Sequence, residues 1–153
     1  MQVCVIDSPV GRLCIQADSG KITALNRTDK PFHAPLTPLL EEAARQLRAY
    51  FDGTLTRFDL PVHMAGTAFQ LRCWEALLTI PYGETISYGE QARRIGQPKA
   101  TRAVGGANHR NPVCIIVPCH RVIGADGALT GYGAGVDMKE WLLRHEQRVS
   151  HGK

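Results

Sequence analysis

The sequence contains no long hydrophobic stretch. No apolar run approaches the ~20 residues that a membrane-spanning helix needs. The N-terminus has no basic segment and reaches an acidic residue at Asp7, so it does not have the pattern of a signal peptide. We therefore expect a cytoplasmic protein.

The sequence also lacks paired cysteines. Its five cysteines are odd in number, and no two of them form a C-x-x-C pair. We therefore expect neither a disulfide framework nor a metal site with the usual zinc spacings, and no cofactor. Unpaired cysteines most often behave as small buried hydrophobic residues.

Acidic residues are scarce in one segment. Residues 1–66 carry seven basic and seven acidic side chains, whereas residues 88–121 carry six basic side chains and only Glu90 as an acid. A surplus of five positive charges over so short a segment suggests a polyanionic partner. A solvated basic surface is the simpler alternative, and charge alone favours it.

The 153 residues contain no internal repeats and suffice for one domain or two small ones. In residues 1–66, a helix is expected from Thr37-Pro38 to Gly53, because Thr and Pro start helices and Gly ends them. The expected strands are 2–6, 12–17 and 21–26, with an edge strand at 58–62. No pattern in this part indicates chemistry, so we expect a supporting domain.

Residues 67–153 predict a mostly helical second domain, which makes the fold class α+β. Capping boxes at Thr67–Gln70 and Ser87–Glu90 start two helices, and Pro98 starts a third. The last two of these resemble a helix-turn-helix. Gly105-Gly106 weakens the third helix, which indicates that something approaches its backbone closely. A nucleic-acid backbone is one candidate, although many short helix-turn-helix units do not bind DNA.

An apolar run leads into a cluster of reactive side chains. Val113–Val117 is expected to be a buried strand that ends at Pro118, because proline cannot donate to a strand ladder. Cys119, His120 and Arg121 follow directly. A base or a cation near a thiol lowers its pKa, and the thiolate is the nucleophile. Neighbouring residues of an extended chain face opposite ways, so a water molecule or a bend would have to connect thiol and imidazole. The alternatives are a structural thiol at Cys119 and an ion pair of Arg121 with Glu146 or Glu140.

Several motifs together resemble the O6-alkylguanine-DNA alkyltransferases, or methylated-DNA–protein-cysteine methyltransferases. The resemblance extends from Thr67 to Glu146, although Gly131–Gly135 departs from the Gly-Tyr-Ser-Gly-Gly lid of relatives. It implies a ribonuclease H-like first domain, a DNA-binding and alkyl-acceptor second domain, and a monomer that binds double-stranded DNA containing O6-alkylguanine. The motifs are Arg102-Ala103-Val104-Gly105-Gly106-Ala107-Asn108, Asn111-Pro112, Ile116-Val117-Pro118-Cys119-His120-Arg121-Val122 and Lys139-Glu140-Trp141-Leu142-Leu143.

The same resemblance implies a reaction. Cys119 would accept the alkyl group from O6 of guanine, and more weakly from O4 of thymine. The transfer would be irreversible, so each protein molecule would repair one lesion. His120 would act through a water molecule as the base toward Cys119, and Glu146 would orient His120.

Further site residues are implied by the resemblance. Tyr88 would push the 3′ phosphate during base flipping and donate to guanine, and Arg102 would enter the base stack where the flipped base leaves it. Asn111 would support the active-site turn. Tyr132 would pack on the flipped base, and the backbone N–H of Gly133 would lie near O6. The rest of the substrate- and DNA-binding set, on a surface that enters the minor groove, is Lys99, Gly105 and Arg121.

Three other functions fit parts of the sequence. A lesion-binding relative without transferase activity would lack the acceptor cysteine, which is present as Cys119. A helix-turn-helix transcription factor would need several base-reading side chains, but the third helix offers small residues and the single Arg102. A cysteine hydrolase would turn over and would not require DNA.

Overall fold

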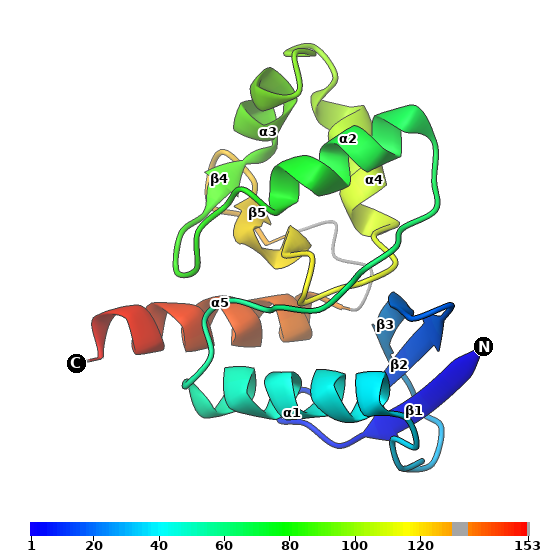
Figure 1. The fold of residues 1–153 in the computed structure, drawn as a ribbon. Helices are drawn as coiled ribbons and strands as arrows, with labels where there is room; N and C mark the ends of the chain where they lie inside the picture. The colour runs from blue at the N-terminus through cyan, green and yellow to red at the C-terminus, as the bar shows by residue number, and fades with distance from the viewer. Residues whose placement is uncertain (130–134, 153) are drawn as a thin grey trace. The chain divides into compact units, whose positions relative to one another are not determined.

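The computed structural model describes residues 1–129 and 135–152 and divides the chain into two compact units, Met1–Met64 and Ala65–Lys153 (Figure 1). The division falls two residues before the boundary predicted at Gly66. No helix in the described part is long and apolar enough to cross a membrane.

The first unit is a three-stranded antiparallel sheet with one helix packed against it. The strands are β1 (Gln2–Ile6), β2 (Leu13–Asp18) and β3 (Lys21–Arg27), in that order across the sheet. The helix α1 (Pro38–Asp52) contacts β1 and β2. It begins where Oγ1 of Thr37 accepts the Leu40 N–H at 3.3 Å, and it ends at Gly53, which has a φ of 82°. These ends are the predicted ones.

The edge strand predicted at 58–62 is wrong. Within 58–62, all of which the structure describes, only Val62 forms a bridge, parallel to Ile22. Only the end of the segment is joined to β3, because the Ile22 N–H donates to the Pro61 carbonyl at 2.8 Å and the Ile22 carbonyl accepts the His63 N–H at 2.9 Å. The side chain of Gln46 on α1 holds the rest of the segment. Its Nε2 donates to the Asp59 carbonyl at 3.0 Å, and its Oε1 accepts the Asp59 N–H at 2.9 Å. A buried carboxamide offers both a donor and an acceptor, so it replaces a strand partner.

The second unit is mostly helical. Its helices are α2 (Ala68–Leu77), α3 (Tyr88–Arg94), α4 (Thr101–His109) and α5 (Val136–His151), and β4 (Ile86–Ser87) pairs in parallel with β5 (Val122–Ile123). Helices α2, α3 and α4 pack against one another (Figure 1). Together with the sheet of the first unit, this arrangement confirms the predicted α+β class.

Local side-chain contacts explain where α2 and α3 begin. At α2, Oγ1 of Thr67 accepts the Gln70 N–H at 3.1 Å and the Gln70 side chain accepts the Thr67 N–H at 3.0 Å, which is the predicted capping box. At α3 half of the predicted box forms. Oγ of Ser87 accepts the Glu90 N–H at 3.0 Å, but the Glu90 carboxylate binds two arginines of the same helix. Gly96, with a φ of 79°, then turns the chain toward α4.

The buried strand predicted at Val113–Val117 is wrong, because this segment is a buried turn. The Val117 N–H donates back to the Val113 carbonyl at 3.0 Å, and Ile115 has a φ of 73°. The carboxamide of Asn111 closes the turn: its Oδ1 accepts the Val113 N–H at 3.0 Å and its Nδ2 donates to the Val117 carbonyl at 2.8 Å. Apolar burial does not distinguish a strand from such a turn, since one side chain satisfies the backbone groups that a neighbouring strand would otherwise satisfy.

Candidate active site

The reactive side chains lie on a tight bend directly after this turn. Cys119–Arg121 form η1, a single turn of 3₁₀ helix that contacts α5. On an extended strand, His120 and Arg121 would point to opposite faces. The bend instead brings both side chains to one carboxylate on α5.

That carboxylate belongs to Glu146, which is 1% exposed. Its Oε2 accepts a hydrogen bond from Nε2 of His120 at 2.6 Å, and its Oε1 accepts one from Nε of Arg121 at 2.8 Å. Nη2 of Arg121 reaches Oε2 at 3.1 Å, and the Gly83 N–H reaches Oε1 at 3.4 Å. Burial alone would raise the pKa of Glu146, but His120 and Arg121 together hold that pKa well below its usual range. The charged carboxylate therefore fixes the orientation of both side chains.

The contact with Glu146 determines which nitrogen of His120 is available. A carboxylate only accepts hydrogen bonds, so Nε2 carries a proton and the neutral ring presents Nδ1 as an acceptor. Burial lowers the pKa of His120, although Glu146 opposes this effect. Among the described residues, Nδ1 has no hydrogen-bond partner. A buried acceptor in this situation is suited to a water molecule or to a proton from a substrate group.

The thiol of Cys119 is nearly buried, with 5% of the residue exposed. Its Sγ accepts Nδ2 of Asn111 at 3.2 Å. Burial raises the pKa of the Cys119 thiol to about 11, while the Asn111 hydrogen bond and the charge of Lys139 lower it in part. The resting thiol is therefore protonated at neutral pH, and reaction as a thiolate requires a base.

Lys139, on α5, is a fully buried cation beside this thiol. Its Nζ donates to the Val122 carbonyl at 2.5 Å and to the Tyr88 hydroxyl at 3.3 Å, and it lies 5.6 Å from the centre of the Tyr88 ring. Burial lowers the pKa of Lys139 to about 8, although Cys119 opposes this effect. Lys139 thus connects the surroundings of the thiol to the first residue of α3.

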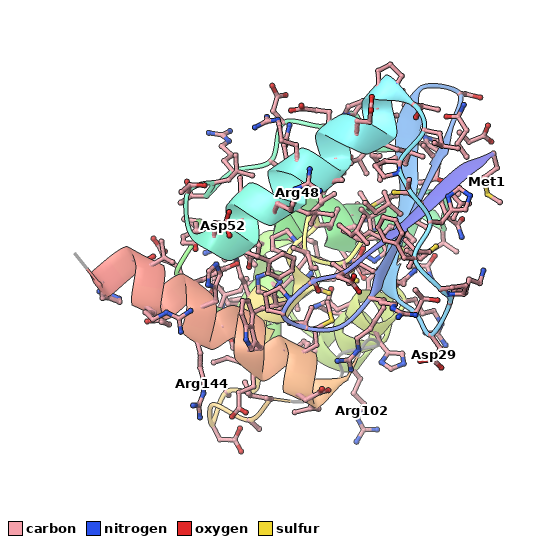
Figure 2. The ribbon with its side chains drawn as sticks, turned by 90° about the horizontal axis from the view of Figure 1, so that it is seen from below. Met1, Asp29, Arg48, Asp52, Arg102 and Arg144 are labelled. Carbon is pink, nitrogen blue, oxygen red and sulfur yellow. The ribbon has the colours of Figure 1, made fainter. Side chains whose placement is uncertain are left out.

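Helix α4 and the residues before it carry an exposed basic surface. Lys99 and Arg102 are exposed, and Figure 2 shows the Arg102 side chain extending away from the ribbon. A Cβ atom on Gly105 would lie 3.9 Å from the Tyr88 ring, so this glycine lies beside the tyrosine. The basic surface and the thiol therefore belong to the same unit, with Tyr88 between Lys139 and α4.

Both units match models of one protein family. Residues 2–64 match the ribonuclease-like domain of 6-O-methylguanine DNA methyltransferase, and residues 68–148 match its DNA-binding domain. The chain belongs to the 6-O-methylguanine DNA methyltransferase family. This confirms the resemblance found in the sequence motifs.

Relatives in this family are similar over nearly their whole length. The methylated-DNA–protein-cysteine methyltransferase of Mycolicibacterium paratuberculosis is 50% identical over 151 residues, which cover 95% of this chain and 92% of the relative. The protein of that name from Methanosarcina acetivorans is 48% identical over 153 residues, covering 95% and 98%.

Solved structures of the family show the same fold. The Mycobacterium tuberculosis O6-methylguanine methyltransferase has a TM-score of 0.90 at 47% identity, covering 99% of this chain and 96% of its own. The M. tuberculosis protein solved in complex with DNA has a TM-score of 0.90 at 49% identity, covering 97% and 94%.

The structure brings together five of the eleven site residues that the resemblance to this methyltransferase family implied. Asn111 contacts the Cys119 thiol, His120 contacts the Glu146 carboxylate, and Tyr88 joins them through Lys139. Tyr132 and Gly133, predicted to contact the flipped base, lie outside the described residues. The clustered residues are Cys119, His120, Glu146, Asn111 and Tyr88.

Arg121 needs a correction. We predicted a contact with substrate or DNA, and an ion pair with Glu146 or Glu140 was the alternative. The structure shows the ion pair with Glu146, because the residue is 8% exposed and its Nε and Nη2 bind that carboxylate. Its remaining terminal nitrogen, Nη1, donates to the Ile80 carbonyl at 2.7 Å, and the guanidinium lies 5.6 Å from the centre of the Tyr82 ring. All three nitrogens face inward, so Arg121 holds the carboxylate.

Sequence reasoning missed Lys139 as a site residue. Lys139 was named only as part of a family motif, and no role was predicted for it. The available signal was spacing: Lys139 and Glu146 are seven residues apart, close to two helical turns, and therefore share a face with the buried Leu142. A lysine on an otherwise buried helix face indicates a cation with a specific partner.

The cysteines form no metal-binding group with other side chains in the part of the chain that the structure describes. All five are buried thiols. Across residues 1–129 and 135–152, no group of three or more His, Cys, Asp or Glu side chains could hold a metal ion.

Proposed function

We propose that this protein reverses alkylation damage in DNA by transferring the alkyl group of O6-alkylguanine to Sγ of Cys119. The observation that carries the proposal is the buried His120–Glu146 pair. This pair leaves Nδ1 of His120 as a hydrogen-bond acceptor, and the preceding residue in the chain, Cys119, carries the protonated thiol. Membership of the methyltransferase family supports it. The activity is that of a methylated-DNA–protein-cysteine methyltransferase that reacts once.

The transfer is a displacement at carbon. A water molecule at Nδ1 of His120 takes the thiol proton of Cys119 and passes a proton to the ring, and the charged Glu146 stabilises the imidazolium that forms. The thiolate forms an S–C bond while the C–O6 bond breaks, and the electron pair stays on O6. The products are guanine and an S-alkylcysteine. Water does not cleave a thioether at neutral pH, so each protein molecule reacts once.

The leaving guanine must gain a proton, and we assign this proton to the hydroxyl of Tyr88. Lys139 donates to the Tyr88 oxygen at 3.3 Å, so its ammonium stabilises the phenolate that forms when Tyr88 gives up the proton. The ammonium of Lys139 also stabilises negative charge on Cys119 and can return a proton to Tyr88. Lys139 therefore stabilises the thiolate and also serves the proton donor Tyr88. Arg121 contributes by holding the Glu146 carboxylate that orients His120.

The lesion must leave the duplex before the thiol can reach it, because the alkyl carbon is inaccessible inside the base stack. Flipping a base costs a few kcal/mol. We assign Arg102 to the space that the flipped base leaves, Lys99 to the phosphates, and Gly105 to close approach of α4 in the minor groove. Tyr132 is proposed to pack on the flipped base, and the N–H of Gly133 to lie near O6.

Three finer points complete the proposal. O4-alkylthymine is a weaker substrate of the same thiol. Residues 1–66 support residues 67–153, which hold the DNA-binding and acceptor groups. The protein acts as a monomer in the cytoplasm, where the reducing environment keeps the acceptor thiol available.

A stoichiometric repair assay tests this function. The protein is incubated with an excess of duplex DNA containing one O6-methylguanine, and restored guanine is counted per protein molecule. We expect one equivalent and then no further repair. Cys119→Ser should give none. Cys114→Ser, which removes a neighbouring buried thiol, should still give one equivalent.

The other outcomes identify the rival functions. DNA binding without repair would favour a lesion-binding or regulatory protein. Repair beyond one equivalent would contradict an irreversible acceptor, and hydrolysis of thiol-reactive esters without DNA would indicate a cysteine hydrolase.

A further inference from the structure

Little apolar packing fixes the register of α4, the helix that carries Arg102. Its buried residues other than Asn108 are Val104 and Ala107, and two of its nine residues are glycine. Its N-cap residue, Ala100, makes no side-chain hydrogen bond. Small side chains let helices approach closely but interlock poorly, so sliding or rotation of α4 meets little steric resistance.

Two buried carboxamides supply the missing constraint. Gln91 on α3 is 0% exposed and Asn108 on α4 is 2% exposed. Nε2 of Gln91 donates to Oδ1 of Asn108 at 3.0 Å, and Nδ2 of Asn108 donates to Oε1 of Gln91 at 2.7 Å. Nε2 of Gln91 also donates to the Cys73 carbonyl of α2 at 3.0 Å.

A third side chain joins the same end of α4 to α2. Nε1 of Trp74 donates to the Ala107 carbonyl at 2.9 Å. Three helices are thus connected by buried polar contacts within the last turn of α4. Sliding the helix would leave these donors and acceptors buried without partners, so the contacts favour one register.

The same asparagine leads to the acceptor thiol. The backbone carbonyl of Asn108 accepts the Asn111 N–H at 3.2 Å, and Nδ2 of Asn111 donates to Sγ of Cys119 at 3.2 Å. Gln91, Asn108, Asn111 and the thiol are therefore linked in this order, because each one forms a hydrogen bond with the next through a side-chain or a backbone group. The proposed chemistry uses neither Gln91 nor Asn108.

We propose that the Gln91–Asn108 pair sets the position of α4 relative to Cys119, so that DNA docked on α4 presents its flipped base to the thiol. The two carboxamides are positioning residues for transfer from duplex DNA. This inference rests on the proposed function and adds how DNA docking is coupled to it. Transfer from a free base requires the thiol and the His120–Glu146 pair but not the register of α4, so it should not depend on the carboxamides.

The test compares a double variant with its swap. Gln91→Leu/Asn108→Leu replaces both carboxamides by apolar groups of similar size and leaves neither amide buried without its partner. Single-turnover rates are measured on duplex DNA with one O6-methylguanine and on the O6-methylguanine base alone. We expect the duplex rate to fall about ten- to a hundredfold, because small displacements of reacting groups have effects of that size. The free-base rate should stay unchanged.

The swap Gln91→Asn/Asn108→Gln keeps the summed length of the two side chains and a reciprocal amide pair, so it should restore most of the duplex rate. Thermal unfolding of each variant shows that it is folded at the assay temperature. Should the leucine pair not fold, Asn108→Gln alone takes its place, because it lengthens one partner and displaces α4. It should then slow the duplex reaction selectively.

Two results would overturn the inference. One is a wild-type transfer rate on duplex DNA in the leucine double variant or in Asn108→Gln. The other is an equal loss on duplex and free base, which would indicate general damage to the unit. Failure of the proposed function would look different, because the wild-type protein would then take a methyl group from neither substrate.

Discussion

Replacing Glu146 by glutamine should remove a large part of the stability of the second unit. Glu146 is 1% exposed and is the counter-charge of Arg121, which is itself 8% exposed. Glutamine has nearly the size of glutamate and keeps one hydrogen-bond acceptor. It leaves the buried guanidinium of Arg121 without an opposite charge. Breaking a buried pair in this way costs about 3–5 kcal/mol. Because domains unfold with only about 5–15 kcal/mol, such a loss is readily measured.

The matched control is Glu140→Gln on the same helix. Glu140 and its partner Arg144 lie 3.4 Å apart, with side chains that are 52% and 77% exposed. Exposed pairs contribute only about 0–1 kcal/mol. Urea unfolding followed by tryptophan fluorescence reports on the correct part of the chain, because Trp74 and Trp141 both lie in the second unit. Equal losses in the two variants would refute the reasoning about the buried charge.

The same carboxylate makes the stability of the wild-type protein depend on pH. The folded-state pKa of Glu146 lies below its usual range, so its stabilising contribution is fully present above the unfolded-state value of ~4.3. The contribution declines as the pH falls below that value toward the folded-state pKa. The difference in unfolding free energy between wild type and Glu146→Gln should therefore shrink in acid. A difference that stays constant across that range would contradict the assignment.

Lys139→Met should slow transfer and change its pH profile. The wild-type rate should rise with pH as the base His120 loses its proton and fall above the Lys139 pKa of about 8, whereas the variant should show no such fall. Single-turnover rates over a pH series measure this, and an identical profile would exclude a role for the ammonium. Burial lowers the pKa of His120, so unfolding free energy should decline as the pH falls below the unfolded-state value of ~6.5. His120→Gln should remove that decline, and the exposed His63→Gln should not. Arg102→Ala should slow repair of duplex DNA far more than transfer from a free base, whereas Lys99→Ala should reduce the salt slope of DNA binding by about 0.9. Equal losses on both substrates would argue against insertion into the base stack.

Most helix ends and the hairpins were predictable from the sequence because they depend on neighbouring residues, but α4 begins at Thr101 and not at the predicted Pro98. Thr67 starts a helix through a side chain that reaches only three residues ahead, and Gly53 and Gly96 end helices with φ values of 82° and 79°. Val113–Val117 was not predictable in this way. Its turn depends on the two hydrogen-bonding ends of Asn111, and hydrophobic periodicity carries no information about them.

The sequence predicted only those site residues that belong to a recognised family motif or that the family resemblance implied. Cys119 and His120 stand next to each other in the chain, and the family resemblance supplied Glu146. The role of Lys139 was not predicted and the pairing of Arg121 with Glu146 was only an alternative, because the partners of both residues are distant in sequence. Lys139 reaches residues 17 and 51 positions away, and Arg121 reaches residues 25 and 41 positions away. Such pairings follow from how α3, β5 and α5 pack, which one sequence does not reveal.

The central claim is that Cys119 accepts the alkyl group, and peptide mass measurement tests it most directly. The protein is incubated with duplex DNA containing one O6-methylguanine, digested, and its cysteine-containing peptides are weighed. We predict one added methyl group on the peptide that contains Cys119 and none on a peptide that contains only Cys73. Restored guanine with Cys119 unmodified, or a methyl group on a different cysteine, would contradict the claim.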